Sequence, residues 1–196
     1  MPRLTLLVIL LGMLCEVPSS PQSRFASRVV GKGAAKVFLC RRYGFSVPVP
    51  PNWFVGLLGD TPFYSNFPPQ DTLGGGALPR NGATISIVAQ ESLPGKEGRE
   101  TLGSWADRDA DLGAAESVIK QDFGIPPETG IERAVRVSFD RKRFGPDDQA
   151  QHDVNIYWVF RGKVFATYLE YVHGDPRAQE YESLVGSLMK RVRPLG

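Results

Sequence analysis

The clearest hydrophobic pattern in the chain lies between residues 152 and 192. Two runs rich in β-branched and aromatic residues, 154–160 and 163–172, are separated only by Arg161 and Gly162. Two such runs joined by two residues, one of them a glycine, predict a β-hairpin. A two-residue turn also fixes the register, which gives three expected cross-strand pairs: Trp158–Phe165, Ile156–Thr167 and Val154–Leu169.

Both faces of this predicted hairpin carry apolar side chains. One face carries Val154, Ile156, Trp158, Phe160, Phe165 and Leu169. The other carries Tyr157, Val159, Val164, Ala166 and Tyr168. An antiparallel sheet with one face in water would alternate apolar and polar residues more regularly. We therefore expect the hairpin to be central in a sheet that is covered on both faces.

The residues after the hairpin predict an amphipathic helix. Asp175 is expected to be its N-cap and Pro176 its first residue, where the missing N–H costs nothing. Apolar residues then recur at helical spacing and form one stripe: Tyr181, Leu184, Val185, Leu188, Met189 and Val192. Such a stripe must be buried, and the adjacent sheet is the expected partner.

Weaker patterns upstream predict more strands and one more helix. The helix is expected over residues 102–112, and the strands are expected over 43–49, 61–67, 83–89, 117–123 and 130–144. In the strand 130–144, Val135, Val137 and Phe139 share one face. The opposite face carries Arg136, Ser138 and Asp140, and is expected to be in contact with water.

The N-terminal residues have the pattern of an export signal. Arg3 precedes an apolar stretch over residues 4–14, which is too short to span a bilayer, since spanning takes about 20 residues. We expect a signal peptide over residues 1–19 and a periplasmic or extracellular location. Lipid attachment at Cys15 is disfavoured because Leu14 precedes it, and retention of the segment as an anchor stays open.

Composition and charge indicate one globular domain. The chain has 196 residues, 42% of them hydrophobic, and a net charge of +2, which gives no argument for nucleic-acid binding. Residues 20–35 predict a flexible lead-in and residues 36–196 the domain. After cleavage only Cys40 remains, so no internal disulfide is possible, and Cys40 is expected to be a buried small hydrophobe.

The order of elements and one short motif resemble a known superfamily. The motif is Tyr43-Gly44-Phe45-Ser46-Val47-Pro48-Val49-Pro50-Pro51-Asn52-Trp53. With the Trp105 helix, the hairpin and the terminal helix, it resembles the PsbP-like superfamily, which includes Mog-type proteins. The resemblance implies an α+β fold, an antiparallel sheet flanked by helices in an α/β/α sandwich. It implies no shared catalytic residues, and its members are chiefly binding and assembly factors.

Candidate chemistry is sparse. His152 and His173 are the only histidines, and both are predicted at the same end of the sheet, where either could act as a base. Asp107, Asp109 and Asp111 resemble the start of a calcium loop, but the required glycine and glutamate are misplaced. A zinc site is disfavoured because a set of histidine and cysteine ligands cannot be completed.

These patterns favour a non-enzymatic exported binding or assembly domain that needs no cofactor or metal and has no catalytic residue. Its expected partner is another protein of the cell envelope, with no nucleic acid and no membrane span after cleavage. The loop 68–82 is the expected contact surface. The candidate binding residues are Trp53, Phe63, Tyr64, Gly74, Gly75, Gly76 and Arg80.

Two alternatives stay open. One is a small hydrolase that uses His152 or His173 with an acidic cluster, which requires an imidazole and a carboxylate to converge. The other is a structural accessory of a cell-envelope complex. The sequence leaves the oligomeric state undetermined. For Trp53 a place in the core is favoured over a place on the contact surface.

Overall fold

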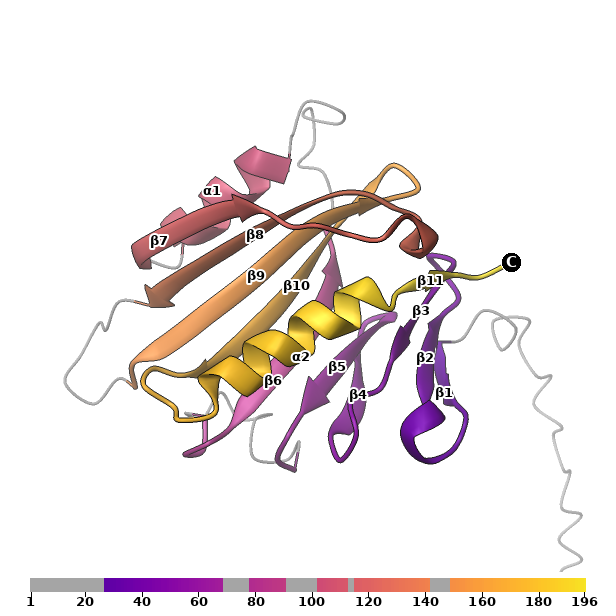
Figure 1. The fold of residues 1–196 in the computed structure, drawn as a ribbon, viewed down its shortest axis with the longest axis horizontal. Coiled ribbons are helices and arrows are strands. Elements are labelled where there is room, and N and C mark those ends of the chain that lie inside the picture. The colour runs from indigo at the N-terminus through magenta and orange to yellow at the C-terminus, as the bar shows by residue number, and fades with distance from the viewer. Residues whose placement is uncertain (1–26, 69–77, 91–101, 113–114, 142–148) are drawn as a thin grey trace, which may run out of the picture.

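The computed structural model describes residues 27–68, 78–90, 102–112, 115–141 and 149–196. These residues form two antiparallel sheets and two α-helices (Figure 1). The larger sheet has seven strands in the order β4-β5-β6-β10-β9-β8-β7, and the smaller has the order β1-β2-β3-β11. The signal peptide expected over residues 1–19 lies outside the described residues.

The strands of the large sheet have these bounds: β4 Phe54–Leu58, β5 Thr61–Ser65, β6 Ala83–Ala89, β7 Ala115–Asp122, β8 Ile131–Arg141, β9 Gln151–Phe160 and β10 Lys163–Val172. Those of the small sheet are β1 Arg28–Val30, β2 Val37–Cys40, β3 Phe45–Pro48 and β11 Arg193–Pro194. Two short 3-10 helices lie at Gly33–Ala35 and Pro127–Thr129. Strand β1 pairs with β2 and so extends the folded domain into the segment 20–35.

The hairpin of β9 and β10 lies inside the large sheet, and its predicted register is confirmed. Trp158 pairs with Phe165, Ile156 with Thr167 and Val154 with Leu169. Arg161 and Gly162 adopt φ values of 50° and 70°, the left-handed conformation that a tight hairpin turn needs at both central positions. The turn therefore sets the register, as its length predicts.

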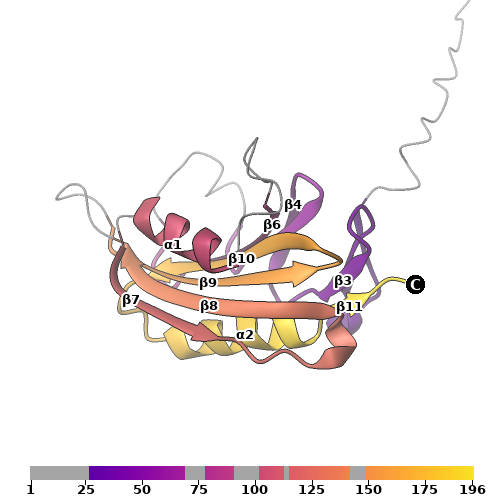
Figure 2. The same ribbon diagram turned by 90° about the horizontal axis from the view of Figure 1, so that it is seen from above.

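The two helices cover opposite faces of the large sheet (Figure 2). Helix α1, Leu102–Leu112, has the predicted bounds, and helix α2, Ala178–Lys190, lies across the other face. The prediction that Asp175 is the N-cap is wrong. Its Oδ1 accepts a hydrogen bond of 2.7 Å from the backbone N–H of Arg177, which completes a turn before the helix begins.

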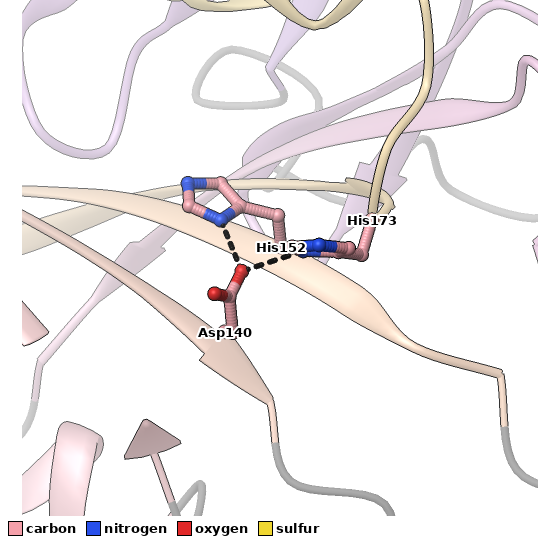
Figure 3. Close-up of side chains that lie close together, drawn as sticks. All are labelled: Asp140, His152 and His173. Atoms are coloured by element: carbon pink, nitrogen blue, oxygen red, sulfur yellow. Dashed lines mark hydrogen bonds and ion pairs between the residues drawn. The ribbon is translucent and has the colours of Figure 1, made fainter. Parts of the chain in front are cut away.

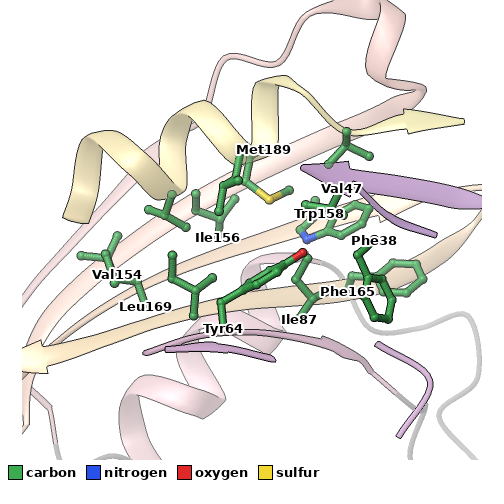
Figure 4. Close-up of a cluster of buried hydrophobic side chains, with 14 of the residues drawn as sticks. Phe38, Val47, Tyr64, Ile87, Val154, Ile156, Trp158, Phe165, Leu169 and Met189 are labelled. Atoms are coloured by element: carbon green, nitrogen blue, oxygen red, sulfur yellow. The ribbon is translucent and has the colours of Figure 1, made fainter. Parts of the chain in front are cut away.

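The main core lies between α2, the large sheet and the small sheet (Figure 4). Helix α2 contributes its predicted stripe, of which Tyr181, Val185, Leu188 and Met189 are buried. A second cluster under α1 contains Trp105, Val137, Phe139 and Tyr157. The hairpin thus supplies core residues to both faces, as its two apolar faces predict.

The predicted α/β/α sandwich is wrong. The fold is mainly β, with a second sheet packed beside the first and one helix on each face of the large sheet. The prediction failed because the small sheet is assembled from strands at opposite ends of the sequence, which no local pattern reveals. No helix in the described part of the chain is long and apolar enough to cross a membrane.

Candidate functional site

Strand register brings a carboxylate and two imidazoles together at one end of the large sheet. Asp140 on β8 is directly opposite His152 on β9, and His152 is opposite Tyr171 on β10. His173 lies just beyond β10, and its backbone N–H donates to the carbonyl of Ala150 at 2.9 Å. Because alternate residues share a face, these side chains lie on the α2 side of the sheet.

One oxygen of Asp140 contacts both histidines (Figure 3). The Nδ1 atom of His152 lies 2.7 Å from Oδ1 of Asp140, and that of His173 lies 2.8 Å from the same oxygen. An ionised carboxylate only accepts hydrogen bonds, so each Nδ1 carries a hydrogen in this arrangement. We call Asp140, His152 and His173 the histidine–aspartate cluster.

The electrostatics of the cluster favour an ionised carboxylate. Partial burial of Asp140 disfavours its charge, but the hydrogen bonds and charges of His152 and His173 outweigh burial and lower the pKa of the carboxyl. The side chain of His173 is 56% exposed, whereas those of Asp140 and His152 are 30% and 24% exposed. The cluster is therefore open to solvent on the His173 side.

A second layer of contacts fixes the His152 ring. The ring centroid of Tyr171 lies 5.2 Å from that of His152, and the Tyr171 hydroxyl donates to Glu182 of α2 at 2.7 Å. Arg136 of β8 donates to the other carboxylate oxygen of Glu182. Burial, reinforced by Glu182, raises the pKa of Tyr171, so its hydroxyl remains a donor. Residues of the sheet and of α2 thus fix the position of the His152 ring.

The cluster has the composition of a transition-metal site. Imidazole and carboxylate ligands suit zinc, copper, nickel and iron, and three protein ligands leave a position open. One ligand atom from each residue lies within 4.8 Å of the other two. Tetrahedral zinc with bonds of about 2.0 Å separates its ligands by about 3.3 Å. An ion bound to all three ligand atoms would require the contacts of 2.7 and 2.8 Å to open to about that separation.

The cluster meets the geometric condition of the predicted hydrolase, because both imidazoles converge on a carboxylate. Neither imidazole has a serine or cysteine as a hydrogen-bond partner within the described ranges.

Asp140 was assigned only to a polar strand face in the sequence. Its contact with the histidines depends on the register between β8 and β9, in which Asp140 is directly opposite His152.

The residues predicted for a contact surface do not gather in one described place. Tyr64 is fully buried, which removes it from any surface, and Trp53 packs edge-on against Tyr181 at a centroid distance of 6.3 Å. Phe63 is half-buried, and Arg80 is exposed. The glycines Gly74, Gly75 and Gly76 lie outside the described residues.

The other candidates are also placed. Asp107 lies on α1 and pairs with Lys120 at 2.8 Å; the side chains of Asp109 and Asp111 are outside the described set. Cys40 is buried as predicted, and its thiol donates to the carbonyl of Asp60 at 3.2 Å. Burial raises the pKa of this thiol to about 12, so it is not a nucleophile at neutral pH.

Comparisons with known proteins leave the family open. No family model matches the chain, and no curated protein matches it. A similar solved structure is PA94 from Pseudomonas aeruginosa, a protein of unknown function that its description links to regulation. It is 14% identical, with a TM-score of 0.46, and the match covers 87% of this chain and 99% of that chain. The resemblance to PsbP-like proteins stays a prediction.

Proposed function

We propose that the chain is a binding domain of an exported protein and that its ligand is a divalent transition-metal ion, represented by Zn²⁺. The observation that carries the proposal is the convergence of two imidazoles on one carboxylate oxygen. This replaces the expectation that no metal is bound. For zinc, that expectation counted histidines and cysteines and left carboxylates out of the ligand set.

Binding of the ion at Nδ1 would displace the hydrogens that His152 and His173 carry there. Asp140 is ionised at neutral pH, as an ordinary aspartate is, and the two histidines lower its pKa further, so it is ready to ligate. Each imidazole can bind the ion at Nδ1 only after that hydrogen leaves, by a shift to Nε2 if the ring is neutral or by loss of a proton if the ring is charged; a ring that turns binds at Nε2 instead. Metal binding should weaken as the pH falls, and it releases a proton from each imidazole that is protonated beforehand.

The test is a titration of chelator-treated protein with Zn²⁺, followed by calorimetry and thermal unfolding. An ion at 100 times its dissociation constant stabilises the folded state by about 2.7 kcal/mol, which raises Tm by about 5–10 °C in a chain of this size. His152→Ala and Asp140→Ala should each remove this shift. Calorimetry in two buffers of different ionisation enthalpy measures the released protons.

A matched control distinguishes binding at the cluster from nonspecific binding by surface carboxylates. Asp107→Ala removes an exposed carboxylate on α1, outside the cluster, and should leave both the affinity and the shift unchanged. The proposal is overturned if Zn²⁺ binds equally to the parent protein and to the double variant of Asp140 and His152. It is also overturned if the parent protein binds no transition metal.

A hydrolase is the second candidate, favoured by the hydrogen-bond distance between each imidazole and Asp140. In that case Asp140 would orient an imidazole that transfers protons at its other nitrogen. Hydrolysis of ester and phosphoester substrates by chelator-treated protein, and its loss in His152→Ala and His173→Ala, would favour this candidate. Activity that survives both substitutions would exclude the cluster as its source.

A further inference from the structure

The two outer strands of the large sheet are protected to different degrees. Strand β7 carries three charged residues, Glu116, Lys120 and Asp122, and a bulge where Ser117 has a φ of 54°. Charges and bulges are the usual devices that prevent a sheet edge from pairing with another chain. Strand β4, Phe54-Val55-Gly56-Leu57-Leu58, has neither a charge nor a bulge.

Strand β4 also exposes large apolar side chains. Leu57 is 60% exposed, and Phe54 and Leu58 are nearly half exposed. The strand is held in place from its inner side and at its tip. It pairs with β5 along its whole length, and the carbonyl of Asp60 in the following turn accepts hydrogen bonds from Ser27 and Cys40. The edge is therefore preorganised as well as apolar.

The backbone of β4 can pair with a second copy of itself. The turn at Gly59 and Asp60 joins Leu58 to Thr61, so Leu58, Gly56 and Phe54 form the hydrogen-bonded pairs with β5. The N–H and C=O groups of Val55 and Leu57 consequently point outward. An antiparallel partner centred on Gly56 places Val55 opposite Leu57 of the second copy, and the outward backbone groups of both have no partner among the residues that the structure describes.

The side chains of β4 fit the same register. It places Phe54 opposite Leu58 of the second copy on one face, and Gly56 opposite Gly56 at the two-fold axis. Only this centre pairs all five residues; a centre at Val55 or Leu57 leaves two of them unpaired. Between residues 52 and 60 the only charged side chain is that of Asp60, which already pairs with Arg42, so no like charges face each other.

We propose that two copies of the chain associate through antiparallel pairing of their β4 strands. The interface is isologous, with the same strand contributed by both subunits, and it joins the two seven-stranded sheets into one. The inference does not depend on metal binding, because the histidine–aspartate cluster lies on β8, β9 and the turn after β10.

Sedimentation velocity of the full chain across a wide concentration range tests the association. The parent protein should dimerise reversibly, and Leu57→Lys should weaken the dimer by about tenfold or more because it places a charge on the pairing edge. Ile119→Lys on β7 is the matched control, since Ile119 is 61% exposed and should leave the dimer unchanged. A parent protein that remains monomeric overturns the proposal.

Crosslinking tests the register. In the proposed register, Gly56 and Gly56 of the second copy form a non-hydrogen-bonded pair. The Cα atoms of such a pair are about 4.5 Å apart, within the range of a disulfide. A Cβ at Gly56 would lie 4.0 Å from the Phe63 ring, an ordinary contact, so the cysteine is tolerated. In a Cys15→Ser background, Gly56→Cys should give a covalent dimer on mild oxidation, and Ile119→Cys should not. Equal crosslinking by both variants contradicts the β4 interface.

Discussion

Arg141 bridges two carboxylates on the sheet face opposite the histidines. It donates from Nε and Nη2 to Asp153 at 3.0 and 2.9 Å, and from Nη2 to Glu170 at 2.9 Å. Asp153 is only 1% exposed. Burial raises the pKa of its carboxyl to about 6, although the charge of Arg141 opposes that change. The unfolded chain loses this proton at a lower pH than the folded protein does. The free energy of unfolding therefore falls as the pH rises from the ordinary pKa of an aspartate to about 6.

Removal of Arg141 should have a pH-dependent cost. Arg141→Met leaves Asp153 buried without its ion-pair partner, and we expect the free energy of unfolding to fall by about 2–3 kcal/mol at pH 8. This lies below the usual loss of about 3–5 kcal/mol for a buried pair because the arginine is partly exposed. At pH 5 the carboxyl is protonated, so the loss should be much smaller. Urea unfolding at both pH values measures it.

Arg42→Met provides the comparison for this variant. Arg42 forms an ion pair with Asp60 at the surface, and exposed pairs contribute about 0–1 kcal/mol. The variant should lose less than about 1 kcal/mol at either pH. A loss for Arg141→Met that is the same at pH 5 and pH 8 would show that packing, and not the unpaired charge, dominates.

At the scale of the element, the β9–β10 turn depends on its left-handed backbone. Gly162 has a φ of 70°, and a Cβ added there would meet no atom within 4 Å. Gly162→Ala should therefore cost about 1 kcal/mol from backbone conformation alone. Gly124→Ala is the matched control, because it is equally uncrowded and has no positive φ. It should be neutral or slightly stabilising. Thermal unfolding of both variants measures the difference.

Sequence patterns predicted the elements better than their assembly. The β9–β10 register and the bounds of α1 follow from local rules, namely turn length and helical periodicity. The fold class could not be obtained in this way because β11 pairs with β3, far away in sequence. The site was half predicted: both histidines were identified, but Asp140 joined them only through pairing of β8 with β9 across a long connection.

At the scale of the molecule, Phe45 joins the two sheets. Its ring, from β3 in the small sheet, meets Trp158, Phe160 and Phe165 of the large sheet edge-on at centroid distances of 5.3, 5.5 and 5.3 Å. Phe45 is fully buried. Because one core cluster contains residues of both sheets, we expect the sheets to unfold together.

Phe45→Ala should lower the free energy of unfolding by about 3–5 kcal/mol, the usual cost of truncating a buried phenylalanine. Tryptophan fluorescence and far-ultraviolet circular dichroism should still give coincident denaturation curves. Ile119→Ala, on the exposed face of β7, should cost no more than about 0.5 kcal/mol. Separate transitions in the parent protein would contradict a single cooperative unit.

The pairing of β11 with β3 has a consequence for the order of events during synthesis. Ser46 and Arg193 meet although they are 147 residues apart, and the backbone N–H of Leu195 donates to the carbonyl of Gly44 at 2.8 Å. A nascent chain that ends at α2 has no strand to cover that side of β3. The small sheet therefore remains incomplete until residues 193–195 have left the ribosome, and closure of so long a loop is intrinsically slow.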